Sequence, residues 1–424
     1  MNNNWLEQIN FPYTRVKFIC KDCFSGGTPS TNNSDYWNGN IPWIASGKMQ
    51  NCIVDSETDF ITEKGLQNSS TRMIPRGSVG IAMTGATCAN VGYIDINTTA
   101  NQSVYSYILK DGYNSKYLFY SLIAMRYEIL SKQNGGAQQG INGETCKNLY
   151  IPQLDLKTQT KVVEYLDIQV DKIDSTIKHL SDEIVELENL KTTITTEIVK
   201  KGINKNKCKK VKYLWIREMN DTYSLGMVKY DFSLHGRIGW QGLTTADYKE
   251  EGPYLITGTD FCEGAVDWNT CVHITDKRFD EDYNIHVKEG DLLITKDGTI
   301  GKIAIALNCP EKVSLNSGIM LIKPVSNKCL TKYLRYVLSS NIFWDWYYYS
   351  QRGNATIKHL YQEQFGYFVY PLPSIKEQEE IVLFLDKKCS KIDELIKIKS
   401  EKIKELNNYK KSLIYECVVL KKEV

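Results

Sequence analysis

Four short polar segments combine hydroxyl, basic and glycine residues, and each follows an apolar run typical of a β-strand. They are Ser46-Gly47-Lys48 and Thr84-Gly85-Ala86-Thr87 in the first half of the chain, and Thr257-Gly258-Thr259 and Asp297-Gly298-Thr299-Ile300 in the second. Glycine lets a backbone approach a ligand closely, and hydroxyl groups at a strand end can donate hydrogen bonds to phosphates or bases. These segments therefore indicate contact with nucleic acid.

Basic and amide side chains extend this candidate contact set. Arg and Lys can read guanine, whereas Asn and Gln can read adenine. An ordinary turn residue or a solvated charge is the alternative at every one of these positions. The candidate DNA contacts are Ser46, Lys48, Arg72, Arg76, Thr84, Thr87, Arg237, Gln241, Thr257, Thr259, Lys277, Arg278, Lys296 and Thr299.

The sequence lacks the motifs that an enzyme would need. Residues 298–302 superficially suggest a phosphate-binding loop, but Lys296 stands where its first glycine belongs and Ile303 replaces the Ser or Thr. Neither H-E-x-x-H nor G-x-S-x-G occurs, and no two prolines are adjacent, which excludes the Asp/Asn-Pro-Pro-Tyr type motif of amino-methyltransferases. We therefore expect a binding protein without catalytic residues.

Metal binding is not expected either. Cys20 and Cys23 form the only C-x-x-C, and no second pair lies at a usable spacing. Cys262, Cys271 and His273 form a looser cluster, which is the alternative metal site. The twelve cysteines are scattered through a long chain without a secretory signal, so a disulfide framework is not expected.

Composition is that of an ordinary globular protein. The 424 residues predict two or three domains, and 42% of them are hydrophobic. The net charge of +2 is low for a free-standing DNA-binding protein. A basic stretch at 200–217 is either a solvated linker or a segment that follows phosphates. Without a signal-peptide pattern or an apolar run of membrane-spanning length, we expect a cytoplasmic protein that does not contact membranes.

The elements that must position these residues are revealed by an internal repeat. Residues 152–202 align without a gap on residues 371–421, at an offset of 219, with 19 of 51 positions identical by direct comparison of the two segments. Pro152 falls on Pro371, and Lys172-Ile173-Asp174 falls on Lys391-Ile392-Asp393. Because a repeat constrains the architecture, it takes precedence over local patterns.

Both copies predict long helices with a coiled-coil seam. Apolar residues follow the 3,4 spacing of heptad a and d positions, and Leu190, Ile194 and Ile198 are expected to continue the first stripe. In the second copy, Cys389 and Lys399 interrupt the seam, which favours one specific register. The alternative is that each helix packs only on its own domain. The seam residues are Val163, Leu166, Val170, Ile173, Ile177, Leu180, Ile184, Leu187, Leu385, Ile392, Ile396, Ile403, Leu406 and Leu413.

The segments before each helix also repeat, but they have diverged further. Lys116-Tyr117-Leu118 matches Lys332-Tyr333-Leu334, and Asn101 matches Asn316. We therefore expect two strand-rich globules, 1–151 and 203–370, each followed by a helical segment, 152–202 and 371–424. If the helices pair antiparallel, the chain has a pseudo-twofold axis, and such symmetry fits a duplex DNA site read in two halves.

These residues resemble the specificity subunit of type I restriction-modification systems. Gly27-Thr28-Pro29 and the segment 36–43 are similar to the opening of a target recognition domain, and the segments 236–243 and 290–302 are similar to a second one. Pro371-Leu372-Pro373, Gln378 and the segment 384–393 resemble the start of the spacer helices. The first domain departs from the pattern, because Thr84-Gly85-Ala86-Thr87 stands where the second has the more family-like Lys296-Asp297-Gly298-Thr299.

The resemblance implies an α/β (α+β) fold in which two target recognition domains, 1–151 and 203–370, are separated by an antiparallel coiled coil of two spacer helices, 152–202 and 371–424. It implies a non-catalytic subunit that reads a bipartite asymmetric target in double-stranded DNA. The implied partners are two methyltransferase subunits and the restriction subunits. S-adenosylmethionine, ATP and Mg²⁺ would be used by those partners, and this subunit would bind no cofactor.

Three other hypotheses remain open. The chain could be the specificity subunit of another restriction system, in which one partner polypeptide carries both nuclease and methyltransferase. It could be a stand-alone coiled-coil interaction protein, which would not bind DNA even with partners present. An enzyme is the third alternative, and the missing motifs argue against it.

Overall fold

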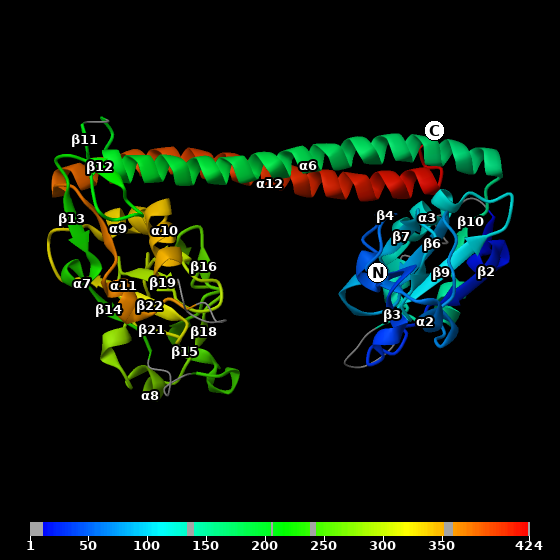
Figure 1. The fold of residues 1–424 in the computed structure, drawn as a ribbon, viewed down its shortest axis with the longest axis horizontal. Coiled ribbons are helices and arrows are strands. Elements are labelled where there is room, and N and C mark those ends of the chain that lie inside the picture. The colour runs from blue at the N-terminus through cyan, green and yellow to red at the C-terminus, as the bar shows by residue number, and fades with distance from the viewer. Residues whose placement is uncertain (1–11, 134–139, 205–206, 238–242, 352–358, 423–424) are drawn as a thin grey trace. The chain divides into compact units, whose positions relative to one another are not determined.

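The computed structural model describes residues 12–133, 140–204, 207–237, 243–351 and 359–422. The chain divides into two compact units (Figure 1). Unit 1 comprises Met1–Ser181 and Ser400–Val424, and unit 2 comprises Asp182–Lys399. Each unit thus combines one strand-rich globule with part of each long helix, α6 (Leu156–Lys201) and α12 (Ile375–Val418).

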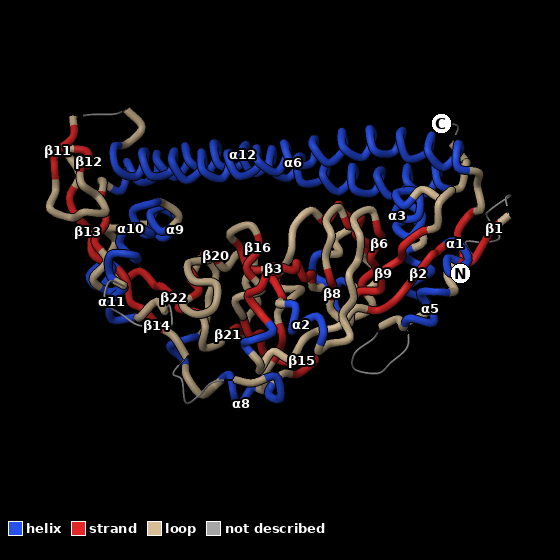
Figure 2. Tube along the Cα trace, turned by 45° about the vertical axis from the view of Figure 1, so that its right-hand side comes forward, coloured by secondary structure: helices blue, strands red, loops and turns tan. Residues whose placement is uncertain are grey.

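Unit 1 is built on two sheets beside short helices (Figure 2). The larger sheet has the strand order β2-β9-β6-β7-β4, the smaller has β5-β3-β8, and β1 pairs with β10. Most pairs are antiparallel, but β3 runs parallel to β8 and β4 parallel to β7. The elements are β1 (Tyr13–Arg15), α1 (Val16–Ile19), β2 (Cys20–Ser25), η2 (Ser34–Tyr36), β3 (Trp37–Ile44), η3 (Ser46–Lys48), β4 (Cys52–Val54), β5 (Asp59–Ile61), α2 (Glu63–Gln67), β6 (Ser78–Ala82), η4 (Gly85–Thr87), β7 (Val91–Ile94), β8 (Thr99–Ala100), β9 (Val104–Leu109), α3 (Ser115–Ala124), α4 (Arg126–Ser131), α5 (Gly143–Lys147) and β10 (Tyr150–Pro152).

Unit 2 repeats this topology. Its larger sheet, β14-β22-β19-β20-β17-β16, follows the order of the first with β16 added at the edge, and its smaller sheet is β18-β15-β21. Strands β13 and β23 pair as β1 and β10 do. The elements are β11 (Cys208–Lys210), β12 (Glu218–Asn220), β13 (Ser224–Met227), α7 (Val228–Asp231), β14 (Phe232–His235), η6 (Thr245–Asp247), β15 (Lys249–Ile256), β16 (Phe261–Cys262), β17 (Ala265–Val266), β18 (Val272–His273), α8 (Asp276–Phe279), η7 (Tyr283–Ile285), β19 (Leu292–Thr295), β20 (Ile303–Ile305), β21 (Val313–Leu315), β22 (Ile319–Pro324), α9 (Thr331–Leu338), α10 (Asn341–Ser350), α11 (Gln362–Gly366) and β23 (Val369–Leu372).

Both long helices expected from the repeat are present. Helix α6 (Leu156–Lys201) has 46 residues and α12 (Ile375–Val418) has 44. Each begins a few residues later than the repeat does, because Pro152 and Pro371 still belong to the strands β10 and β23. The four-segment division at 151/152, 202/203 and 370/371 stays a prediction.

The two helices run antiparallel within each unit (Figures 1 and 2). In unit 1, Tyr165 lies near Lys422 and Asp174 pairs with Lys410. In unit 2, residue numbers again rise along α6 as they fall along α12, since Glu183 pairs with Lys399 and Lys191 pairs with Asp393. The predicted fold class, two strand-rich globules with two long antiparallel helices in an internal repeat, is confirmed.

The buried face of the helices follows the predicted stripe, with one correction. Every residue from Val163 to Leu187 and from Leu385 to Leu413 that was assigned to the seam is buried or half-buried. Leu190, however, is exposed, whereas Lys191 is half-buried. The 3,4 spacing itself runs from Leu187 to Lys191 and then to Ile194, so the expectation for Leu190 was wrong because apolar character was preferred over strict spacing.

Each globule is joined to both helices of its unit through equivalent contacts. In unit 1, the Gln159 side chain accepts a hydrogen bond from the Asn114 amide (2.9 Å) and donates to the Leu154 carbonyl (2.8 Å). Gln378 repeats this arrangement in unit 2 with Leu330 and Pro373. The hydrophobic core of unit 1 contains Leu413, Ile414, Cys417 and Val418 of α12, and that of unit 2 contains Ile198 and Val199 of α6.

Candidate nucleic-acid interface

In unit 1, the two polar segments found in the sequence meet at a single turn. The Asn101 amide donates to the carbonyl of Ile44, the last residue of β3 (2.9 Å). The amide of Met83, the first residue after β6, donates to the Ser103 carbonyl (2.8 Å). The Thr84 hydroxyl also donates to the Ser103 hydroxyl (2.8 Å). The turn 101–103 therefore brings the Ser46–Lys48 and Thr84–Thr87 segments to the same end of the globule.

The Ser46–Lys48 segment, η3, is anchored to the sheet by the residue that follows it, Met49. Met49 is fully buried, and a Cβ added at Gly80 or Gly92 would lie 3.1 Å or 2.6 Å from its sulfur. Those two glycines thus make room for Met49 on the sheet. Lys48 donates from Nζ to the Ser56 hydroxyl (3.0 Å), and a Cβ at Gly47 would meet open space. The segment is consequently fixed at its base and open at its tip.

Unit 2 repeats this convergence. The Asn316 amide donates to the Ile256 carbonyl (3.0 Å), and the Lys296 amide donates to the Gly318 carbonyl (2.8 Å). The turn 316–318 thus joins the Thr257–Thr259 and Lys296–Thr299 segments. This geometry explains why Asn101 and Asn316 matched in the sequence.

Internal hydrogen bonds shape the second pair of segments. Asp260 is buried and accepts from the Thr257 amide (2.7 Å) and hydroxyl (3.0 Å), and the Thr259 hydroxyl lies 2.7 Å from that of Thr257. The Thr295 hydroxyl donates to the Thr299 carbonyl (2.6 Å). Gly298 has φ +66°, which favours glycine and matches Gly85 at +72° in the first globule.

A segment that sequence reasoning did not select adjoins these turns. In unit 1, the Ile141 amide donates to the Met83 carbonyl (2.9 Å), and in unit 2 the Leu360 amide donates to the Lys296 carbonyl (3.0 Å). His359 also contacts the Asp297 carboxylate through Nδ1. The signal that could have found it is the equivalence of Ile141 and Leu360 at the repeat offset of 219.

All four predicted arginines are paired with acidic side chains, and the buried one, Arg237, lies 3.5 Å from Glu281. Arg72 pairs with Asp22 and lies 4.0 Å from the ring centre of Phe24. Arg76 binds both oxygens of Asp95 (2.8 and 3.2 Å), and this raises the pKa of its guanidinium. Hydrogen bonding to Glu281 raises the pKa of Arg278 in the same way. Lys277, on α8, is exposed.

Arg237 was expected to contact DNA, and its position corrects that expectation. Its side chain is buried, with 1% of the residue exposed. It donates from Nε to the Leu315 carbonyl (2.8 Å) and from a terminal nitrogen to the Ser314 hydroxyl (3.0 Å), and burial lowers its pKa. A guanidinium held inside the globule cannot reach a base edge. Gln241, another predicted contact, lies outside the described residues.

The described residues offer no cluster for a metal. No group of three or more His, Cys, Asp or Glu side chains in this part of the chain is arranged to hold an ion. Cys20 is buried, which raises the pKa of its thiol to about 12, and burial likewise raises that of Cys271 to about 12. No disulfide bond joins any two of the twelve cysteines, all of which lie within the described residues.

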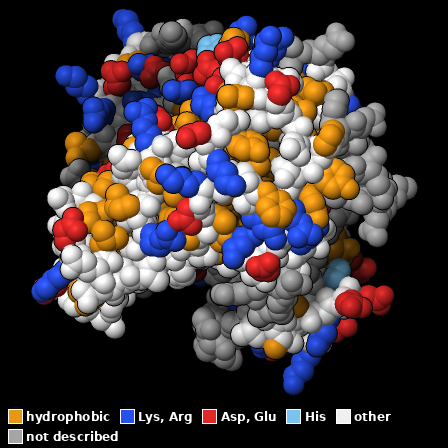
Figure 3. Space-filling view, turned by 90° about the vertical axis from the view of Figure 1, so that its right-hand side faces the viewer, with side chains coloured by type: hydrophobic (Ala, Val, Ile, Leu, Met, Phe, Trp, Pro, Cys, Tyr) orange, Lys and Arg blue, Asp and Glu red, His pale blue; other side chains and the backbone are white. Residues whose placement is uncertain are grey.

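Charge on the face drawn in Figure 3 is mixed rather than strongly basic. The face drawn in Figure 3 carries Lys and Arg side chains spread among hydrophobic and uncharged ones, with acidic residues between them. Among the described helices, none combines the length and apolar character that crossing a bilayer requires.

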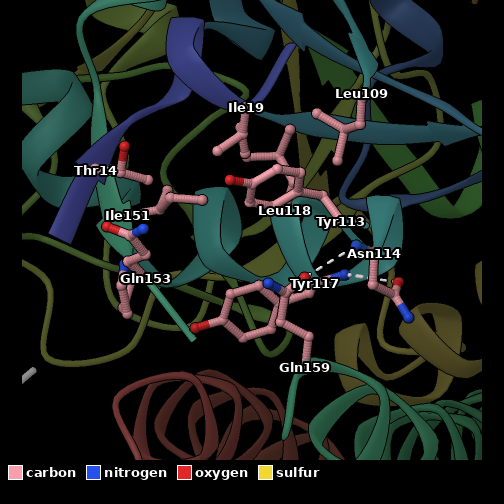
Figure 4. Close-up of a pocket in the computed structure, with 11 residues that line it drawn as sticks. Thr14, Ile19, Leu109, Tyr113, Asn114, Tyr117, Leu118, Ile151, Gln153 and Gln159 are labelled. Atoms are coloured by element: carbon pink, nitrogen blue, oxygen red, sulfur yellow. Dashed lines mark hydrogen bonds between the residues drawn. The ribbon is translucent and has the colours of Figure 1, made fainter. Parts of the chain in front are cut away.

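Figure 4 shows how the first globule meets the start of α6. Asn114, Tyr117 and Gln159 lie around a small pocket whose other walls include Thr14 of β1 and Ile151 of β10. The Tyr117 hydroxyl donates to the Val418 carbonyl of α12 (3.2 Å), and Tyr333 lies 3.5 Å from the equivalent Val199 carbonyl in unit 2. The repeat thus preserves the attachment of the globules more closely than their polar turns.

A family model described as Type I restriction modification DNA specificity domain matches residues 15–189 and 241–408. The chain belongs to this family. The first match covers the first globule and much of α6, and the second covers the second globule from residue 241 onward and much of α12. The family model therefore matches the chain once in each half of the internal repeat.

Individual relatives agree with this membership. The chain is 33% identical over 150 residues to the specificity subunit of the Escherichia coli type I restriction enzyme EcoR124I/EcoR124II, a match over 34% of this chain and 37% of the relative. It is 32% identical over 169 residues to that of the Methanocaldococcus jannaschii enzyme MjaIX, over 38% of each chain. These matches span little more than a third of either relative.

The fold is shared along almost the whole chain. A chain solved in work on complex assembly and conformational transition of the type I R-M system superposes with a TM-score of 0.67, over 96% of this chain and 97% of that chain. Sequence identity is 15%, so this likeness concerns the fold.

Proposed function

We propose that this chain is the DNA-recognition subunit of a type I restriction-modification complex. The observation that carries the proposal is membership of the specificity-domain family in a chain whose two globules share a scaffold and differ at their turns. Thr84-Gly85-Ala86-Thr87 and Asp297-Gly298-Thr299-Ile300 occupy equivalent places with different chemistry. Two unlike readers on one scaffold suit an asymmetric target in two halves.

In this proposal, the turns around 101–103 and 316–318 face DNA. Both present hydroxyl groups and a lysine, Lys48 or Lys296, beside backbone that glycine leaves open. Such groups can bind phosphates and base edges. The long helices set the gap between the half-sites.

The subunit itself is not catalytic. Two methyltransferase subunits, using S-adenosylmethionine, and restriction subunits, using ATP and Mg²⁺, supply the chemistry in the complex. A net charge of +2 supports this division, because partner subunits can provide further contacts to the DNA.

The deciding experiment is methylome sequencing of a host that carries the operon with and without this gene. We expect one bipartite methylated motif that disappears with the gene. Replacing residues 1–151 by the equivalent domain of another family member should change one half of the motif, and replacing 203–370 should change the other. If either exchange altered both halves or neither, the assignment of one reader to each half would be wrong.

A second test addresses the turns. Lys48→Ala with Thr84→Ala, and separately Lys296→Ala with Thr299→Ala, should weaken DNA binding by the assembled complex. Each lost phosphate contact should reduce the slope of log affinity against log salt by about one. Lys64→Ala is the control, because Lys64 is exposed on α2 and pairs with Asp35. Equal effects of Lys64→Ala and the turn variants would contradict the proposed interface.

A further inference from the structure

Three lysines occupy seam positions of the long helices, and each binds an acidic residue of the opposite helix. Lys410 lies 2.6 Å from Asp174 in unit 1. In unit 2, Lys191 lies 2.6 Å from Asp393, and Lys399 lies 2.8 Å from Glu183. Charged groups beside a coiled-coil seam commonly decide register and partner choice.

Two of these pairs are copies of one another. The repeat offset of 219 carries Asp174 onto Asp393 and Lys191 onto Lys410. The pair Asp174–Lys410 and the pair Lys191–Asp393 are therefore the same contact, made once in each unit. We call them the outer pairs.

The outer pairs do not distinguish pairing between α6 and α12 from pairing of either helix with its own copy in a second chain. If α6 paired antiparallel with α6 of a second copy in the same register, Asp174 would meet Lys191 of that copy. If α12 did the same, Asp393 would meet Lys410. Orientation and register are thus fixed, but a homotypic arrangement satisfies the outer pairs as well as the observed one does.

The third pair, Glu183–Lys399, has no such copy. The offset relates Glu183 to Lys402, and it relates Lys399 to Leu180. In a homotypic α12 pair, Lys399 would therefore face Lys402 of the second copy, twice. In a homotypic α6 pair, Glu183 would face Leu180. Only pairing between α6 and α12 places Glu183 opposite Lys399.

We propose that the Glu183–Lys399 pair selects heterotypic pairing, so that α6 closes on α12 of the same chain rather than on α6 of a second copy. The outer pairs set how the helices align, and this central pair sets which helices align. Both side chains are partly buried, with 35% and 24% exposed, so their pairing is less screened than that of surface charges.

The selection has a consequence that rests on the proposed function. A homotypic dimer would bring two copies of the same globule together on a common coiled coil, and such an object fits a twofold-symmetric target. Heterotypic pairing keeps two unlike globules together and therefore keeps the target asymmetric. Glu183 and Lys399 would thus determine specificity without touching DNA.

The test uses the full chain, refolded from denaturant over a range of concentrations and measured by light scattering after size exclusion. Lys399→Glu replaces the attraction to Glu183 by repulsion, and it turns both Lys399–Lys402 clashes of the homotypic α12 pair into attractions. One ion pair near the surface changes an equilibrium constant by roughly a factor of two. The substitution reverses the Glu183–Lys399 contact of the monomer and both Lys399–Lys402 contacts of the dimer, so we expect the dimerisation constant to rise by about tenfold or more. Glu183→Lys combined with Lys399→Glu restores the central attraction and should return the protein toward monomer.

Lys410→Glu is the matched control. It weakens one outer pair in the monomer and the equivalent pair in the homotypic α12 arrangement equally, so it should lower stability without favouring the dimer. A wild-type protein that is mainly dimeric, a Lys399→Glu variant no more dimeric than Lys410→Glu, or a double variant as dimeric as Lys399→Glu alone would each overturn the proposal. If the variants pair as expected but the assembled wild-type complex does not bind DNA, the proposed function alone would be wrong.

Discussion

Gln159 and Gln378 show how one side chain can attach a globule to a long helix. Each accepts a hydrogen bond from one backbone amide and donates to a backbone carbonyl just before its helix, and each is almost fully buried. Gln378 also donates to the Lys328 carbonyl (2.8 Å). Gln159→Leu would leave the Asn114 amide and the Leu154 carbonyl without that partner. Because an unsatisfied buried polar group costs about 1–3 kcal/mol, we expect a loss of about 2 kcal/mol in the free energy of unfolding, measured by urea denaturation.

Gln153→Leu is the control for that measurement, since Gln153 is exposed and lies just before α6. Gln378→Leu should destabilise unit 2 by a similar amount. Should Gln159→Leu be as stable as Gln153→Leu, the buried amide would not contribute to attachment.

His235 predicts a pH dependence of stability. Burial, and then the nearby charge of Lys323, lower the pKa of its imidazole below the ordinary value of 6.5. Between the lowered folded-state pKa and 6.5, the unfolded chain binds more protons than the folded chain, so stability is lost as pH falls through this window. Replacing His235 by Asn should flatten the decrease in unfolding free energy below about pH 6.5, measured by denaturation at a series of pH values. Parallel curves for the two proteins would show that His235 does not titrate in this way.

Individual site residues were only partly predictable. The sequence correctly placed Thr84 and Lys296 after the ends of strands, because glycine and hydroxyl residues after an apolar run mark a strand end, whereas their contact with DNA stays a prediction. It could not show that Arg237 is buried against Ser314 and Leu315, because those partners are 77 and 78 positions away. Burial is decided by such distant contacts, so residue type alone misassigned this arginine.

At the scale of elements, the long helices were the most predictable feature. Their seam depends on spacing within one segment, and strict spacing even identifies Lys191 as a seam position. The strand order of the sheets was less predictable from the sequence, because the order β2-β9-β6-β7-β4 depends on pairings between strands far apart in the chain. The repeat offered the best guide, since each unit has the topology of the other.

The spacer role of the helices can be tested by a paired deletion. Removing residues 175–181 from α6 and 403–409 from α12 takes one heptad from each and keeps all three charge pairs and the seam phase. At 1.5 Å per residue the helices shorten by about 10 Å, so under the proposed function the gap should shrink by about three base pairs. Methylome sequencing would report the new gap, with both half-sites unchanged. An unaltered gap in an active complex would rule out the helices as spacers.

At the scale of the whole chain, unit 1 depends on residues from both ends of the sequence. Leu413 of α12 is 1% exposed and belongs to the core of the first globule. Leu413→Ala should cost about 2–4 kcal/mol, and the effect should be confined to unit 1. Hydrogen exchange would then speed up in α3 and remain unchanged in α9.

Leu383→Ala is the comparison for that variant, because Leu383 lies on the same helix and is 70% exposed. We expect its stability to change by less than about 0.5 kcal/mol. Faster exchange in α9 for Leu413→Ala would indicate that the two units do not unfold separately.

The C-terminal turns of α12 also bear on how the protein is made. A ribosome delivers residues in order, so all of unit 2, from Asp182 to Lys399, has been synthesised before Leu413, Ile414 and Cys417. The hydrophobic core of the first globule is therefore incomplete until Leu413, Ile414 and Cys417 have been synthesised. All residues of unit 2 are present before that point. The order of synthesis is therefore opposite to the order of completion, and a chain that ends before Leu413 would contain all residues of unit 2 beside an incomplete first globule.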